Sequence, residues 1–290
     1  SSDVCSSDLT IAAVAGQFAT VDLPRGYDYE SIHVRVYGTV NVTTAATSVR
    51  AEAPCQVVPR MELVADGRNT LFSAPMWFAS LAKYDRPNML ETGARVVTAP
   101  TSAAIAAYPF EVNGVIDLAT VDGERPKDSN FRTDGLQLFQ LRLTFGQAID
   151  MFVPGAGVAA FTAFNVEIST VEMVEIPDAN GQRTTPVALK KVSYQELAVP
   201  TSNANQEVRL PAGNMIKSLV IRTDGITTAG EPTTGALNRL QVFSGVDVRI
   251  NQLAGAIRGQ NNNDFGQLTA GYYIAELSRS GAPTARLSEL

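Results

Sequence analysis

The stretch VDLPRGYDYESIHVRVYG, residues 21–38, is written a second time as VRLPAGNMIKSLVIRTDG at residues 208–225. The two segments align without a gap, and in each a Leu-Pro-x-Gly turn precedes a run in which apolar and polar residues alternate. Alternation with a period of two is typical of a half-buried β-strand, and Pro and Gly favour the turn before it. A turn and strand that recur in this way predict an internal repeat. The identical pairs are Val21 and Val208, Leu23 and Leu210, Pro24 and Pro211, Gly26 and Gly213, Ser31 and Ser218, Arg35 and Arg222, and Gly38 and Gly225.

The alternation also assigns the two faces of each predicted strand. The inner residues are Ile32, Val34 and Val36 in the first copy and Leu219 and Ile221 in the second. The opposite face carries His33, Arg35 and Tyr37 in the first copy and Val220, Arg222 and Asp224 in the second. The match is therefore one of pattern as well as of identity.

The likeness continues in the segments that follow each copy. PRMELVADG at 59–67 resembles NRLQVFSG at 238–245, and YPFEVNGVIDLA at 108–119 resembles LTAGYYIAELSR at 268–279. Between these segments, near-helical spacing predicts one short helix in each repeat. The residues with that spacing are Trp77, Leu81 and Tyr84 in the first repeat and Ile250, Leu253 and Ile257 in the second.

The first repeat then adds three strand-like runs, at 135–146, 149–155 and 158–173, which have no counterpart in the second. We therefore expect a first domain at residues 10–176, a linker at 177–204 rich in Pro, Asn, Thr and Gln, and an incomplete second domain at 205–290. The repeat logic suggests that roughly 40 further residues belong to the second domain of the natural protein. The segment SSDVCSSDL, residues 1–9, lacks the features of a signal peptide and is expected to be a non-native scar.

Composition favours an all-β protein. The chain has 290 residues, of which 45% are hydrophobic and only 18% charged, with 22 Gly and 15 Pro, a profile of short strands and many turns. We predict two tandem jelly-roll β-sandwiches, each with a short helix. The formal net charge of −6 argues against sequence-specific binding of nucleic acid, and no apolar run reaches the roughly 18–20 residues of a membrane-spanning helix.

Residues that could carry catalysis or bind a metal are few. The single histidine, His33, has Val220 at its place in the second repeat, so a duplicated catalytic role is not supported. Cys55 shows no metal-ligand spacing and is expected to be a small apolar residue near a loop end. Five acidic residues crowd one region, where either a carboxylate or calcium site or an exposed turn-rich loop is possible; their spacing misses the calcium-loop pattern. They are Asp117, Asp122, Glu124, Asp128 and Asp134.

Binding of small molecules has equally little support in the sequence. No phosphate-binding glycine motif is present. Trp77, Phe78 and Tyr84 could stack on a sugar or base, but a stripe at helical spacing is more typical of a core. The run GQNNNDFGQ at 259–267 is predicted to be a polar loop. We therefore expect no catalytic residue, no cofactor and no metal.

The repeated segments resemble the double jelly-roll major capsid proteins of tailless icosahedral viruses with an internal membrane, of the corticovirus type. The resemblance rests on the L-P-x-G turn before SIHVRVYG or SLVIRTDG, on the R-x-x-[LV] strands RMEL and RLQV, and on the GVID and GYYI strands. It implies a structural coat protein rather than an enzyme. A homotrimer would form a pseudo-hexagonal capsomer that contacts neighbouring capsomers, minor capsid or vertex proteins and an internal viral membrane. Such a protein would be assembled in the host cytoplasm, a bacterial one for a bacteriophage, and would reside in the virion.

Two other classes remain open at this point. A carbohydrate-binding or glycan-active β-sandwich predicts exposed aromatic side chains and a carboxylate pair on one face. A viral spike or adhesion module predicts a fibrous trimer.

Overall fold

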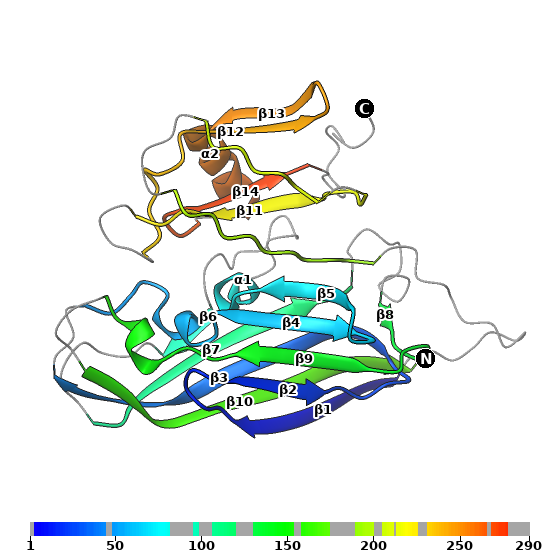
Figure 1. The fold of residues 1–290 in the computed structure, drawn as a ribbon, viewed down its shortest axis with the longest axis vertical. Coiled ribbons are helices and arrows are strands. Elements are labelled where there is room, and N and C mark those ends of the chain that lie inside the picture. Colours follow the sequence, from blue (N-terminus) through cyan, green and yellow to red (C-terminus); the bar gives the residue numbers. More distant parts are fainter. Residues whose placement is uncertain are drawn as a thin grey trace, which may run out of the picture.

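The computed structural model describes most of the chain in eleven ranges. They are residues 3–44, 48–81, 95–98, 106–119, 130–153, 158–174, 189–199, 205–211, 213–225, 231–265 and 268–277. Two β-rich halves follow one another along the chain, and the second half packs beside the helix α1 (Met76–Ser80) of the first (Figure 1). No helix in these ranges is long and apolar enough to cross a membrane.

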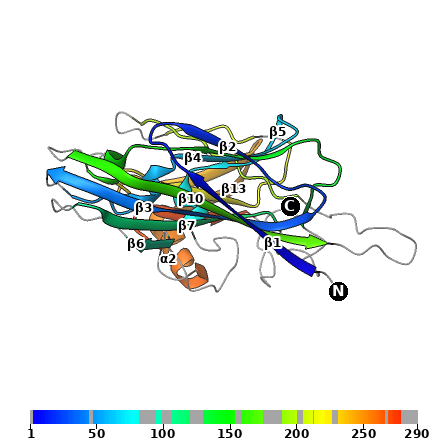
Figure 2. The same ribbon diagram turned by 90° about the horizontal axis from the view of Figure 1, so that it is seen from below.

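The first half is a sandwich of two antiparallel sheets, which form separate layers in Figure 2. The larger sheet has the order β1-β10-β3-β7-β6, with β8 paired to β3, and the smaller sheet has the order β2-β9-β4-β5. The strands of the larger sheet are β1 (Asp3–Ala12), β3 (Asp28–Thr44), β6 (Arg95–Thr98), β7 (Tyr108–Asp117), β8 (Phe131–Arg132) and β10 (Val158–Val174). Those of the smaller sheet are β2 (Phe18–Asp22), β4 (Arg60–Ala65), β5 (Asn69–Ala74) and β9 (Phe139–Thr144).

The connectivity of the first half is that of a jelly roll. Apart from the short β6 and β8, the strands pass between the sheets in the pattern expected of two Greek keys: β1 lies in one sheet, β2 in the other, β3 in the first again. The eight long strands thus form two four-stranded layers that face each other. This arrangement confirms the all-β sandwich predicted for the first repeat.

The core lies between the two layers. Ile32, Val34 and Val36 of β3 are at most 1% exposed, whereas His33 between them is exposed and Arg35 is half-buried. The predicted inner and outer faces of this strand are therefore confirmed. Side chains of the smaller sheet meet β3 from the other side, among them the fully buried Met61, Leu63, Leu141 and Leu143.

The repeated turn has the same backbone conformation in both halves. Gly26 has a φ of 95° and Gly213 a φ of 100°, in the left-handed region that residues with a Cβ resist. The hydroxyl of Tyr29 donates a hydrogen bond of 2.7 Å to the carbonyl oxygen of Pro24 and holds the first turn against the start of β3. Gly38 is required for a different reason, because a Cβ there would collide with the carbonyl oxygen of Ala163 on β10.

The second half repeats the order and the pairing of the first. β11 (Ser218–Arg222) pairs with β14 (Tyr272–Glu276) as β3 pairs with β7, and β12 (Arg239–Ser244) pairs with β13 (Asp247–Leu253) as β4 pairs with β5. The helix α2 (Ala254–Phe265) follows β13 as α1 follows β5. In these pairs Ser31 lies opposite Asp117, and its counterpart Ser218 lies opposite Glu276. The predicted internal repeat is confirmed for these elements.

Six strands of the first half have no counterpart among the described residues of the second. They are β1, β2, β6, β8, β9 and β10. The segment 205–211 occupies the place of β2, immediately before the turn at Gly213, but it is not in a strand. In the first half β2 obtains its ladder from β9, and the part of the second half that the structure describes contains no strand paired with 205–211.

Three predictions about local structure were wrong, and the first two concern strands. The run at 149–155 is not a strand; it contains the end of a 3₁₀ helix, η3 (Ala148–Met151), which the capping box between Gln147 and Asp150 favours. The predicted helical spacing of Ile250 and Leu253 is also wrong, because both lie in β13.

The polar run at 259–267 was predicted to be a loop, but residues 259–265 belong to α2. The reason is Asn261, which is 2% exposed. Its side-chain amide donates to the carbonyl oxygen of Ile274 at 2.7 Å, and its side-chain oxygen accepts from the backbone N–H of Ile274 at 2.9 Å. These two bonds fasten α2 to β14 and outweigh the modest helix propensity of asparagine.

Part of the predicted linker lies against the first half. Val192 forms a parallel bridge with Phe72 of β5, with backbone hydrogen bonds of 2.9 Å from Val192 to Leu71 and 3.0 Å from Ser73 to Val192. At the other end of the chain, β1 includes residues 3–9 and pairs with β10 along its full length. The domain boundaries and the non-native origin of residues 1–9 stay predictions.

Candidate assembly interface

The two halves are joined by a charged contact. Arg222, at the end of β11, donates through Nε and Nη2 to the carboxylate of Glu52, the residue before the 3₁₀ helix η1 (Ala53–Val57) of the first half. The closest distances are 3.0 Å from Nε and 2.9 Å from Nη2, both to Oε2. Nη1 of Arg222 also pairs with Asp224. The planar guanidinium therefore fixes the orientation of the second half relative to the first.

This ion pair is buried. The side chain of Glu52 is 2% exposed and that of Arg222 is 11% exposed. Burial raises the pKa of Glu52, and the hydrogen bonds and charge of Arg222 oppose this effect. Such a pair contributes little net stability when intact, but leaving either charge alone in the interior costs a great deal.

Aromatic side chains surround the ion pair. The ring of Trp77 in α1 lies 5.4 Å from that of Tyr272 in β14 and 6.3 Å from that of Tyr194 in the linker. The guanidinium carbon of Arg222 lies 5.8 Å from the centroid of the Trp77 ring. Tyr272 belongs to the main hydrophobic core, and Val220 packs against it, so the two halves share one core.

Arg35, the counterpart of Arg222 in the first copy of the repeat, has a different environment. Arg35 lies on the outer face of β3 and forms ion pairs of 2.8 Å with both Glu111 and Glu167. Its guanidinium lies over the ring of Tyr37, 4.4 Å from the centroid, and its side chain is 42% exposed. The hydrogen bonds from Arg35 lower the pKa of Glu111. Arg222 is thus covered by the other half, whereas among the described residues its counterpart Arg35 stays partly exposed.

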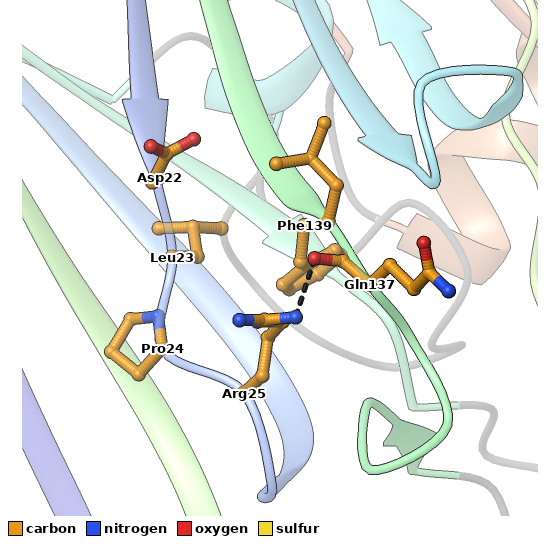
Figure 3. A pocket seen from close by; sticks show the side chains of 7 residues that line it. Asp22, Leu23, Pro24, Arg25, Gln137 and Phe139 are labelled. Carbon is orange, nitrogen blue, oxygen red and sulfur yellow. Dashed lines mark hydrogen bonds between the residues drawn. The ribbon is translucent and has the colours of Figure 1, made fainter.

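A surface pocket of ≈ 420 Å³ lies at the first copy of the repeated turn (Figure 3). The guanidinium of Arg25 points across it and donates to the backbone carbonyl oxygens of Leu136, at 3.1 Å, and Gln137. The carboxylate of Asp22 accepts from the side-chain amide of Gln140 at 2.8 Å. Arg25 thus joins the turn to the segment before β9, Asp22 joins β2 to β9, and the residues that line the pocket offer no pair of catalytic groups.

Comparison with solved structures finds similar chains among viral coat proteins. The major capsid protein of Sulfolobus turreted icosahedral virus matches with a TM-score of 0.66 and 19% identity over 97% of this chain and 89% of that chain. The PBCV-1 virus capsid matches with 0.62 and 15% over 99% and 79%, and the major capsid protein of bacteriophage PM2 with 0.53 and 10% over 96% and 84%. This chain has the double jelly-roll fold. No protein-family model and no curated protein matches it.

Of the residues considered for chemistry, the structure of this double jelly roll describes His33, Asp117 and Asp134, and these three lie apart in separate environments. His33 is exposed on β3, with its Nε2 3.1 Å from the hydroxyl of Ser31. Asp117 ends β7 and pairs with Lys190 at 3.7 Å, and Asp134 is exposed. Asp122, Glu124 and Asp128 lie outside the described residues, and among the residues that are described no group of three or more His, Cys, Asp or Glu could hold a metal ion.

The aromatic residues considered for ligand stacking belong to the core. Trp77 is 7% and Phe78 9% exposed, and the two rings contact each other edge to face at 6.0 Å. Tyr84 lies outside the described residues. The core interpretation of Trp77 and Phe78 is confirmed. Sequence reasoning missed the contact of Arg222 with Glu52; its one available signal was the arginine shared by both copies.

Cys55 is buried in the double jelly roll, as predicted, and we expect its thiol to be unreactive. Burial raises the pKa of Cys55 to about 12, despite a hydrogen-bond contact of 3.4 Å with the hydroxyl of Ser80. In a Cys5→Ser variant, a disulfide reagent at pH 8 should react at least about 100-fold more slowly with the folded chain than with the chain in guanidinium, because the thiolate is the reactive form. Equal rates would contradict the buried position.

Proposed function

We propose that this chain is the major capsid protein of an icosahedral virus and that three copies form one pseudo-hexagonal capsomer. The observation that carries the proposal is the likeness to major capsid proteins over nearly the whole chain, 96–99% of it, rather than over one sandwich. A single jelly roll occurs in proteins of many functions, but two in tandem with a common core restrict the choice.

The geometry provides a reason for the duplication. Three chains with two similar sandwiches each place six sandwiches around one axis, so a threefold assembly has an almost sixfold outline. The buried contact of Arg222 with Glu52 supports this role, because it gives each chain a fixed angle between its two sandwiches. Hexagonal tiles of this kind cover the flat faces of an icosahedral shell.

The partners follow from the same proposal. Each capsomer would contact neighbouring capsomers, minor capsid or vertex proteins and an internal viral membrane beneath the shell. The protein would be assembled in the host cytoplasm and reside in the virion. The net charge of −6 favours a shell that does not bind the genome directly. The proposed role is structural rather than enzymatic.

The rival functions have less support. A glycan-binding sandwich needs aromatic residues at the surface, but Trp77 and Phe78 are buried. A spike or adhesion module would form fibres rather than tiles, and the likeness to whole capsid proteins gives no support for a fibre.

Electron microscopy and light scattering of the purified full chain test the proposal. We expect particles of about three times the 30.9 kDa of one chain, with a hexagonal outline in negative stain. Chains that stay monomeric up to high concentration, or that form fibres, would contradict it. Binding to a glycan array by such a monomer would favour the carbohydrate-binding alternative.

A further inference from the structure

Within one chain, the outer face of one sheet meets the helix side of the other sandwich. In the second half that face is formed by β11 and β14 and carries Val220, Arg222 and Tyr272. In the first half the contacts come from Trp77 in α1 and Glu52 before η1. Figure 1 shows β11 and β14 on the side of the second half that faces α1. This contact is head to tail, because two different surfaces meet.

The first half has the same sheet face, and among the described residues only Lys190 of the linker lies against it, through its ion pair with Asp117 at the end of β7. The register places His33 opposite Val115 and Arg35 opposite Asn113, as it places Val220 opposite Ile274 and Arg222 opposite Tyr272. These residues of β3 and β7 are half-buried or exposed, although Arg222 and Tyr272, the counterparts of Arg35 and Asn113, contact the first half. We call the surface formed by His33, Arg35, Asn113 and Val115 the β3 face.

The second half has the counterpart of α1, and its outer side is open as well. Ala254, Ile257 and Asn261 of α2 are buried toward β14, as Met76 and Ala79 of α1 contact Gly114 of β7. The other side of α2 is exposed. We call this exposed side the α2 face; its residues are Gly255, Ala256, Gly259, Gln260, Asn262 and Asn263.

We propose that the β3 face of one copy of this chain packs against the α2 face of a second copy. The contact would repeat between chains the contact that joins the halves within one chain. It rests on the proposed function and names the surfaces that hold its capsomer together. The occupant is a second copy of this chain. The contact within the chain joins a sheet face to the helix side of a sandwich, and a second copy offers the matching surface to each of the two remaining faces.

The two faces complement each other in shape. Gly255 and Ala256 are small and follow β13 where Trp77 follows β5, so they leave room for the long side chains of the β3 face. Charge does not select the partner: Arg35 is paired with the carboxylates of Glu111 and Glu167, and the register places Arg95 of β6 beside Asn113, so the charges on this side of the sheet balance within the chain.

A head-to-tail contact of this kind closes into a ring if the rotation from one sandwich to the next returns to the start. Alternating internal and external contacts then give a ring of three chains and six sandwiches. Each external contact uses one β3 face and one α2 face. A chain damaged in only one face therefore retains the other, and this asymmetry can be measured.

Two variants test the proposal by light scattering of the full chain. Val115→Glu places a carboxylate in the β3 face, and Ala256→Glu places one in the α2 face. We expect each variant alone to be monomeric, whereas an equimolar mixture should contain particles of two chains, because one intact face of each kind remains. Thr144→Glu, an exposed position on the outer face of β9 in the smaller sheet, is the matched control and should assemble like the unchanged chain. Circular dichroism melting curves show whether each variant folds.

A cross-link tests the same contact without damaging it. In a Cys5→Ser chain, His33→Cys together with Ala256→Cys should give covalent dimers and trimers under mild oxidation, and Thr144→Cys with Ala256→Cys should not. The unchanged chain could form trimers while Val115→Glu and Ala256→Glu form them equally well and no cross-link appears. In that case the proposed contact is wrong, but the proposed trimeric capsomer still holds. If the unchanged chain never forms trimers, both are wrong.

Discussion

Replacing Arg222 with alanine is expected to lower the free energy of unfolding by about 3–5 kcal/mol at pH 7–8, the usual cost of removing one partner of a buried ion pair. The side chain of Glu52, which is 2% exposed beside Arg222, would lose its cation. Asp224 and Glu231, which lie near enough to raise the pKa of Glu52, would add repulsion. Urea unfolding followed by the fluorescence of Trp77, the single tryptophan of the chain, measures the change at the contact itself.

The loss should depend on pH in a defined direction. Without Arg222, nothing opposes the effect of burial and of the nearby Asp224 and Glu231, so the pKa of Glu52 in the folded chain rises further above the value of about 4.3 in the unfolded chain. A group whose pKa is higher in the folded state than in the unfolded state is tolerated in the interior while it is protonated. The cost of the unpaired Glu52 carboxylate to the stability of the variant is therefore small below about pH 4.3 and grows as the pH rises toward the folded pKa. The variant should therefore approach the unchanged chain in stability near pH 4.

Two controls separate this effect from general damage. Arg222→Ala combined with Glu52→Gln removes the buried charge, so it should recover part of the stability at pH 8 and lose the extra pH dependence. Arg239→Ala removes an exposed arginine from β12 and should change stability by less than about 0.5 kcal/mol. A loss below about 1 kcal/mol for Arg222→Ala at pH 8 would show that the ion pair does not join the halves.

The repeat is the part of the fold that the sequence predicts well. Leu-Pro-x-Gly followed by alternating apolar residues specifies both a turn with a positive φ at Gly26 and Gly213 and the inner face of β3. These signals are local, because the geometry of a turn and the period of a strand depend on residues near one another in the chain. The pairing of β11 with β14 then follows from the pairing of β3 with β7.

The elements that were missed depend on distant partners. GQNNNDF has no amphipathic pattern, and it becomes the second part of α2 because one side chain, that of Asn261, bonds the backbone of Ile274. In the same way, alternation correctly places Arg222 and Ile221 on opposite faces of β11. It does not tell whether water or another sandwich lies against the face that carries Arg222. Glu52 is 170 residues away, in a segment that the repeat alignment does not cover.

Truncation of Trp77 to alanine is the second change with a large expected effect, a loss of about 3–5 kcal/mol in the free energy of unfolding, as for other buried tryptophans. Trp77 is 7% exposed and contacts elements of both halves and of the linker. Its removal leaves a cavity at the contact and takes away the ring beneath the guanidinium of Arg222. Urea unfolding followed by circular dichroism at pH 8 measures the loss.

Trp77→Phe should cost less than Trp77→Ala, because a smaller ring still fills part of the space between α1 and Tyr272. Phe243→Ala is the control for the loss of an aromatic ring: Phe243 is 57% exposed on β12, and its truncation should change stability by less than about 1 kcal/mol. Since Trp77 and Arg222 touch, the losses of their alanine variants should not add. Additive losses would mean that the ring and the ion pair act independently. They would contradict the inference that both belong to one shared core, which holds the two sandwiches at a fixed angle.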